Sequence, residues 1–222
     1  MDFRTARAAM VESQIRPNNV RDTDVLNAFA TTPRELFVPE SQKPLAYIDE
    51  ALPIEPVKAG GEARYLLPPM ILARLLQFGG PYPVDKALDV GCVTGYSAAI
   101  LSKLCGGVVA LEASEALAGR MQDFLKSAQV GSVRVESGPL NAGFAASKPY
   151  DLILLNGFAA KEPESLFAQM AEGGRLLALI GSRWCGQAYV YTKSDGIVSG
   201  RAIFDASGEV LPGFEAQPHF VF

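Results

Sequence analysis

The stretch from Lys86 to Leu104 most constrains the fold of this chain. A short apolar run, 87–90, carries one acidic residue, Asp89, and ends at Gly91. Apolar residues at helical spacing resume after Gly95. This order predicts a strand, a glycine turn and a helix, an arrangement that presents backbone N–H groups to a bound ligand at the start of the helix.

A second apolar run, 108–111, follows the turn and is closed by Glu112. In folds of this kind, an acidic residue after the second strand holds the ribose hydroxyls of a nucleotide-like ligand. The spacing Asp-x-Gly-x-x-x-Gly differs from the dinucleotide fingerprint Gly-x-Gly-x-x-Gly. The turn alone is equally compatible with an ordinary strand-to-helix connection, but the position of Glu112 favours a ligand site.

Length and composition exclude several classes of protein. The chain of 222 residues suits one domain, or one domain with a small appendage. Its 49% hydrophobic and 20% charged residues indicate a well-packed globular protein. The net charge of −4 provides no basic footprint for duplex nucleic acid. Apolar runs fall short of the length of a membrane span.

Cysteine usage and the first residues favour the cytoplasm. Cys92, Cys105 and Cys185 are odd in number, widely spaced and set among apolar residues, so we expect reduced core cysteines. The first residues lack the basic-then-apolar pattern of a signal peptide.

Strands and helices are expected to alternate along most of the chain. Helices are predicted over 2–15, 22–31, 68–78, 114–128 and 163–170, and strands over 132–136, 150–157 and 175–181. An Asp195-Gly196 turn predicts a closing hairpin. The fold class is therefore α/β, a doubly wound, mostly parallel sheet with antiparallel C-terminal strands. The proline-bounded segments 33–39 and 46–54 are expected to be extended.

Those two segments carry a family resemblance. The strings PRELFVP (33–39) and AYIDEALPI (46–54) are similar to the N-terminal signature of the protein-L-isoaspartate O-methyltransferases. The glycine turn resembles the first motif of S-adenosylmethionine-dependent methyltransferases. PYDLILLNG (149–157) and EGGRLLALIG (172–181) stand where that family has its fourth and fifth strands. The resemblance spans nearly the whole chain.

The resemblance implies a seven-stranded, Rossmann-like methyltransferase sheet in a single domain, 1–222. Residues 1–67 would form N-terminal helices and an active-site loop, and residues 68–222 the core. The implied cofactor is S-adenosylmethionine, bound near the point where the strand order reverses. The cofactor-binding residues implied by this match are Asp89, Gly91, Cys92, Gly95, Glu112 and Gly138. No metal site is expected.

Two departures from the family concern the cofactor. Val93 stands where the family usually has glycine, and a β-branched residue at positive φ costs about 1–3 kcal/mol. Either this turn has another shape or the pocket is narrowed. Pro139 stands where the family has an acidic residue, and proline supplies neither a carboxylate nor an N–H. We expect both departures to weaken cofactor binding.

A third departure concerns the acceptor. Counting back from Pro68, the family's serine position falls on Leu66 and its threonine position on Arg64, so no catalytic residue is assigned. Leu66 is expected to face a charged acceptor with an apolar wall, which predicts little methylation of isoaspartyl peptides. Arg64 could instead pair with an acceptor carboxylate. The single histidine, His219, is expected to be structural.

Two functions follow. The first is S-adenosylmethionine-dependent methylation of a carboxylate on a peptide or protein, in the manner of protein repair. An ionised acceptor needs no general base, because the enzyme's task is to hold carboxylate and sulfonium in line. The alternative is a catalytically degenerate paralogue that retains the fold as a binding module. The acceptor, the partners and the oligomeric state are left open.

Overall fold

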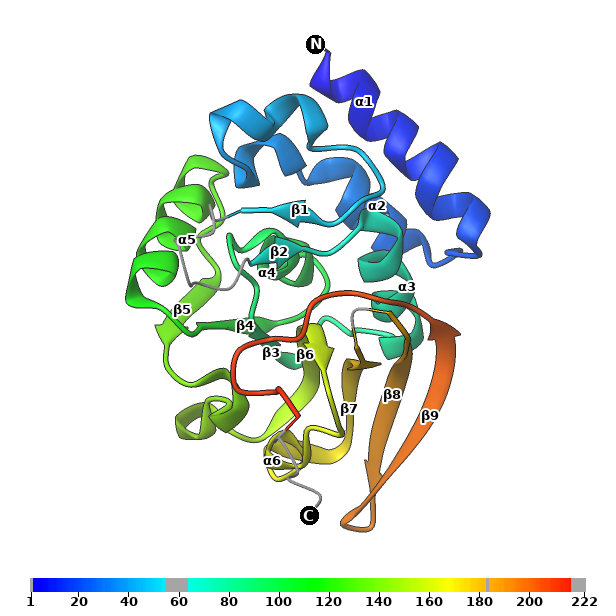
Figure 1. Ribbon diagram of the computed structural model, residues 1–222, viewed down its shortest axis with the longest axis vertical. Coiled ribbons are helices and arrows are strands. Elements are labelled where there is room, and N and C mark those ends of the chain that lie inside the picture. Colours follow the sequence, from blue (N-terminus) through cyan, green and yellow to red (C-terminus); the bar gives the residue numbers. More distant parts are fainter. Residues whose placement is uncertain (1, 55–63, 183, 217–222) are drawn as a thin grey trace, which may run out of the picture.

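A seven-stranded sheet forms the centre of the computed structural model, which describes residues 2–54, 64–182 and 184–216 (Figure 1). Its strands are β3 (Lys86–Val90), β4 (Gly107–Glu112), β5 (Val133–Ser137), β6 (Tyr150–Ala159), β7 (Met170–Gly181), β8 (Gly186–Ser194) and β9 (Ile197–Asp205). Their order is β5-β4-β3-β6-β7-β8-β9. The first five are parallel, and β8 and β9 are antiparallel to their neighbours. The predicted fold class is confirmed.

Helices and short turns surround this sheet. The α-helices are α1 (Phe3–Met10), α2 (Thr23–Thr31), α3 (Pro69–Gly79), α4 (Tyr96–Leu101), α5 (Glu115–Ser127) and α6 (Glu164–Phe167). Helix α1 continues into a π-helical turn over Val11–Ile15. The strands β1 (Leu52–Pro53) and β2 (Tyr65–Leu66) form a separate antiparallel pair. None of the helices in the described residues is long and apolar enough to cross a bilayer.

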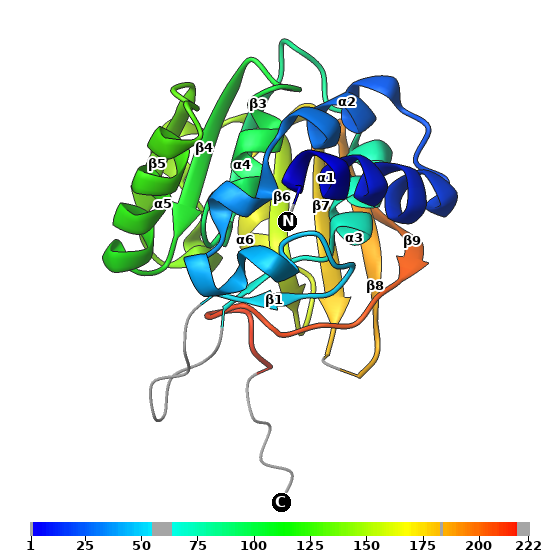
Figure 2. The ribbon, with the colours of Figure 1, turned by 90° about the horizontal axis from the view of Figure 1, so that it is seen from above.

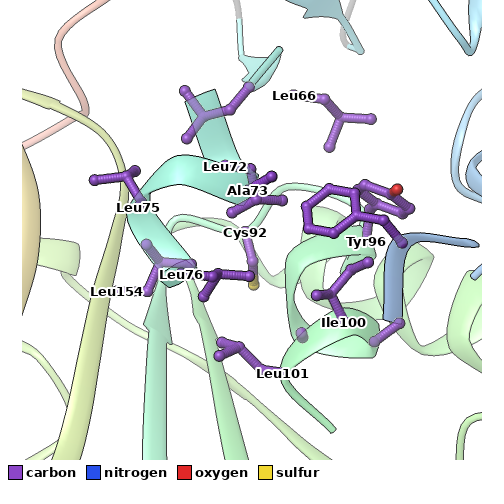
Figure 3. Close-up of a cluster of buried hydrophobic side chains, with 14 of the residues drawn as sticks. Leu66, Leu72, Ala73, Leu75, Leu76, Cys92, Tyr96, Ile100, Leu101 and Leu154 are labelled. Carbon is purple, nitrogen blue, oxygen red and sulfur yellow. The ribbon is translucent and has the colours of Figure 1, made fainter. Parts of the chain in front are cut away.

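The two faces of the sheet are covered differently. Leu152, Leu154 and Leu177 point to the face where α1, α2, α3 and α4 pack, and Figure 3 shows part of this core. Strand alternation sends Ile153 and Leu155 to the other face. There the cover is α6, short 3-10 turns and the segment that follows β9. Figure 2 shows the helical layer in front of the strands.

Two predicted elements differ in the structure. The segment 33–39, expected to be extended, contains a 3-10 helix over Arg34–Phe37. The Leu36 N–H donates to the Pro33 carbonyl, and this turn buries the Phe37 ring against that of Tyr96. The predicted helix over 163–170 is only one turn long, because Met170 already pairs with Tyr150 at the start of β7.

The cysteine prediction is correct for two of three residues. Cys92 and Cys105 are buried, whereas Cys185 is exposed in the connection between β7 and β8. The carbonyl of Cys185 accepts a hydrogen bond from the N–H of Ser182, so this cysteine belongs to a surface turn.

The N-terminal caps of α2 and α5 differ, and this difference predicts how much each cap residue contributes to stability. The Asp22 carboxylate accepts hydrogen bonds from the N–H groups of Asp24 and Val25, at 2.9 and 3.0 Å, and caps α2. Ser114 occupies the same position before α5 but makes no side-chain capping bond. We expect Asp22→Ala to lower the free energy of unfolding by about 1 kcal/mol, and Ser114→Ala by less than about 0.5 kcal/mol. Urea titration measures both, and equal losses would contradict this assignment.

Candidate functional site

The candidate site lies where the strand order reverses. Strands β4 and β5 follow β3 on one side, while β6 and β7 extend the sheet on the other. In open α/β sheets, ligands bind in the crevice beyond the carboxyl ends of the strands at such a point. Here the corresponding crevice position lies between Gly91, directly after β3, and Gly157 in β6, and the side chain of Leu211 fills it.

Glu112 faces the glycine turn across this crevice. Its Oε1 accepts a hydrogen bond from the N–H of Val93 at 2.7 Å, and its Oε2 accepts one from its neighbour Ala113 at 2.9 Å. The side chain is fully buried. The glycine turn and this carboxylate are therefore in direct contact.

The turn itself adopts an unusual backbone. Gly91, Val93 and Gly95 have φ values of 80°, 57° and 86°. Val93 is thus a β-branched residue in the left-handed region, with a strain of about 1–3 kcal/mol. Its side chain packs into the core on the helical face, so it does not narrow the crevice.

Gly95 and Cys92 face α5 rather than the crevice. A Cβ on Gly95 would lie 2.8 Å from Cγ of Met121, so this glycine permits close packing of α5. The Cys92 Sγ lies 3.7 Å from the Met121 Sδ, within the core of Figure 3, and burial raises the pKa of the thiol well above its ordinary value. The side chain of Cys92 therefore cannot reach a ligand in the crevice.

Gly138 lies beside Glu112 at the end of β5. Its N–H donates to the Glu112 carbonyl at 2.9 Å, and a Cβ at this position would meet only Leu111. Pro139 follows at the surface and starts a 3-10 turn over Leu140–Ala142. Gly138 thus fixes the backbone of Glu112, and Pro139 is exposed at the surface beside it.

Asp89 belongs to a buried polar cluster beneath the turn. Its Oδ2 accepts a hydrogen bond from Ser97 at 2.5 Å, and its Oδ1 accepts one from Asn156 Nδ2 at 3.4 Å. Asn156 also donates to the Ser97 hydroxyl. Burial raises the pKa of Asp89 to about 7, although both hydrogen bonds oppose this shift, and the Glu112 carboxylate adds to it.

This pKa predicts how stability depends on pH. Folded Asp89 keeps its proton up to about pH 7, whereas the unfolded side chain loses it near its ordinary pKa of 3.8. Unfolding is therefore expected to become easier as the pH rises between these two values. Urea titrations at about pH 4.5 and about pH 8 should show a smaller loss of stability for Asp89→Asn than for the parent protein. An unchanged pH dependence in the variant would contradict the assignment.

Arg64 supplies the partner of Glu112. Its Nη1 and Nη2 each lie 2.8 Å from one carboxylate oxygen, and Nη2 also donates to the Gly91 carbonyl at 3.1 Å. Both side chains are removed from solvent, with exposed fractions of 6% for Arg64 and 0% for Glu112. The pair is bidentate and charge-assisted, the strong form of this interaction.

Strand pairing explains the orientation of Arg64. The N–H of Ile54 donates to the Arg64 carbonyl, directly next to the pairing of β1 with β2. Alternate residues of an extended segment share a face, so Arg64 and Leu66 both point inward. Leu66 lies in the core close to Tyr96, as Figure 3 shows, and is 3% exposed. The expectation that Leu66 forms an apolar wall against the acceptor is therefore wrong.

The segment that follows β9 covers the crevice. The N–H of Leu211 donates to the Phe158 carbonyl at 2.8 Å, which places the Leu211 side chain between two glycines. A Cβ on Gly157 would lie 2.6 Å from Leu211 Cγ, and one on Gly91 would lie 3.1 Å from its methyl groups. Leu211 occupies the space that these glycines leave.

A cavity lies beside Leu211 and the segment that follows β9. It has a volume of about 220 Å³, and six of its lining residues are Arg64, Tyr65, Leu67, Asn156, Phe158 and Leu211. Asp89, Gly91, Gly95 and Glu112 are themselves buried. These four of the six residues predicted to bind the cofactor thus lie at one edge of the sheet, but Arg64 and Leu211 fill the space above them. The rest of the predicted active-site loop, 55–63, lies outside the described residues, as does His219.

Sequence reasoning did not place Ser97, Asn156 or Leu211 at the site. Asn156 had a usable signal, since it is a polar residue before a glycine in an otherwise apolar strand. Ser97 and Leu211 had no such sequence signal, because a serine in a helix and a leucine near a glycine are common in any context.

The strand order, the glycine turn and the acidic residue after the second strand define the class of Rossmann-like methyltransferases. A solved structure described as a protein-L-isoaspartate O-methyltransferase superposes with a TM-score of 0.80 at 24% identity, covering 93% of this chain and 66% of that one. A putative protein-L-isoaspartate O-methyltransferase from Plasmodium falciparum, in complex with S-adenosyl-L-homocysteine, superposes with a TM-score of 0.77 at 20% identity, covering 92% and 97%.

Sequence comparison identifies the family within this class. The model of the family Protein-L-isoaspartate(D-aspartate) O-methyltransferase (PCMT) matches residues 5–205. A protein-L-isoaspartate O-methyltransferase from Koribacter versatilis is 38% identical over 194 residues, covering 87% of this chain and 85% of that protein. One from Aeropyrum pernix is 37% identical over 184 residues, covering 81% and 68%. The chain belongs to the protein-L-isoaspartate O-methyltransferase family.

Proposed function

We propose that this protein transfers the methyl group of S-adenosylmethionine to a carboxylate of a peptide or protein acceptor, in the manner of its family. The observation that carries the proposal is Glu112, whose buried carboxylate faces the Gly91–Gly95 turn where a ribose would lie. Family membership supports the same chemistry. An isoaspartyl side chain is the acceptor that the family name indicates, and repair of damaged protein in the cytoplasm is the corresponding role.

The residues assigned to the cofactor site have different proposed roles. Glu112 is proposed to bind the ribose hydroxyls, and the backbone of Gly91 to allow close approach of the cofactor. Asp89, Gly95 and Gly138 position the turn and Glu112, and Cys92 contributes its backbone alone. The strained Val93 and the loss of an acidic side chain at Pro139 are proposed to weaken cofactor affinity.

A second candidate is a binding module that has lost turnover. The buried Arg64–Glu112 pair favours it, because this pair occupies the polar groups that a cofactor needs. Calorimetric titration with S-adenosylhomocysteine, followed by a radiolabelled methyl-transfer assay on an isoaspartyl peptide, separates the two candidates. The first predicts saturable binding to one site together with methyl transfer. Folded protein that transfers no methyl group at saturating cofactor would reject it in favour of the second.

A further inference from the structure

Glu112 has no hydrogen-bonding capacity left for a ligand in this structure. Each of its two oxygens already accepts two hydrogen bonds, one from Arg64 and one from a backbone N–H of Val93 or Ala113. A carboxylate offers about four lone-pair sites in total. A ribose diol that binds Glu112 must therefore replace existing donors.

Arg64 is the donor that a ligand can displace. The N–H groups of Val93 and Ala113 belong to the turn and to the residue next to Glu112, so the local backbone holds them in place. Arg64 reaches Glu112 from another part of the chain by a flexible side chain, 48 positions away in sequence. It also lines the neighbouring cavity of about 220 Å³, which provides room for a guanidinium that has left Glu112.

Arg64 also occupies the space in front of the glycine turn. A Cβ on Gly91 would lie 3.3 Å from its Nη2, and the Gly91 carbonyl accepts a hydrogen bond from the same atom. The guanidinium therefore covers both the backbone and the carboxylate of the proposed cofactor site.

We propose that Arg64 is an internal competitor for the cofactor's ribose, which sets the affinity of the site by holding Glu112 until the ribose hydroxyls replace it. This inference rests on the proposed function, because it concerns the same site. Arg64 thereby acts as an affinity-determining residue. A ligand without ribose hydroxyls has nothing to offer Glu112 in exchange.

The first test compares S-adenosylhomocysteine binding by calorimetry in four proteins: the parent, Arg64→Gln, Arg64→Lys and Arg74→Gln. Arg74→Gln is the matched control, since Arg74 lies over the Phe204 ring of β9, 3.9 Å from its centroid, at the far edge of the sheet. We expect the Kd to fall at least about tenfold in Arg64→Gln, the equivalent of one lost charge-assisted hydrogen bond. Arg64→Lys should be intermediate and Arg74→Gln unchanged.

The outcomes separate this inference from the proposed function. Equal affinity of parent and Arg64→Gln would overturn the competitor role and leave cofactor binding intact. No binding by any folded variant would reject the proposed function and the inference together. Circular dichroism monitors folding. If Arg64→Gln does not fold, Arg64→Lys decides the matter, because it retains a cation for Glu112, and an affinity equal to that of the parent would overturn the inference.

A second test identifies the group that competes. Adenosine and 2′,3′-dideoxyadenosine differ only in the ribose hydroxyls. We expect Arg64→Gln to bind adenosine more tightly than the parent does and to show no such gain for the dideoxy compound. An equal gain for both nucleosides would show that Arg64 only fills space, and would overturn its role as a competitor for Glu112.

Discussion

Replacing Glu112 with glutamine is expected to destabilise the protein by about 3–5 kcal/mol, because it leaves a buried guanidinium without its anionic partner. The Arg64–Glu112 pair is bidentate and almost fully removed from solvent. Urea titration at neutral pH measures the loss. A stability within about 1 kcal/mol of the parent would contradict the buried pairing.

An exposed ion pair on the same chain provides the control. Arg16 and Glu12 are 3.0 Å apart on the N-terminal helical segment, with side chains 52% and 62% exposed. Glu12→Gln should cost less than about 1 kcal/mol. The double variant Arg64→Gln/Glu112→Gln should recover part of the loss, since no unpaired charge remains, and the double-mutant cycle gives the coupling energy of the pair.

Methyl transfer to an isoaspartyl peptide is expected to be slow at low cofactor concentration. The sequence predicted low turnover from an apolar wall at Leu66, but that side chain lies in the core. The structure provides a different reason, because the cofactor must displace Arg64. A lost hydrogen bond to a charged group is worth about 1.5–3 kcal/mol, which corresponds to a decrease of about 10- to 100-fold in kcat/KM for S-adenosylmethionine.

A radiolabelled methyl-transfer assay tests this prediction by measuring kcat/KM for S-adenosylmethionine. The comparison protein is the relative from Koribacter versatilis, named protein-L-isoaspartate O-methyltransferase, and the control substrate is the same peptide with ordinary aspartate. A kcat/KM equal to that of the relative would show that Arg64 presents no barrier. Arg64→Gln separates this barrier from a poor fit of the acceptor, since only the former disappears with the arginine.

The fold followed from local patterns. The alternation of apolar runs with helical segments predicted a doubly wound, mostly parallel sheet, and the Asp195-Gly196 turn predicted the β8–β9 hairpin. The segment 33–39 was mispredicted because its prolines suggested an extended chain. The burial of Phe37 against Tyr96, a contact between residues far apart in sequence, favours a 3-10 turn instead.

The site was only partly predictable for a related reason. Glu112 and Gly91 were predicted at the candidate site because their positions are defined relative to a strand end. The position of Arg64 depends on the pairing of β1 with β2, and that of Leu211 on a hydrogen bond to Phe158. These are non-local contacts, and neither spacing nor composition encodes them. Counting along the loop therefore placed Leu66 at the acceptor, although strand alternation turns it into the core.

The cover that Leu211 provides also decides how a ligand gains access to this end of the sheet. The Leu211 side chain fills the space in front of Gly91 and Gly157 for as long as the segment after β9 stays docked on Phe158. A ligand that reaches these two glycines must therefore displace a seated side chain, and its rate of entry depends on movement of the segment after β9.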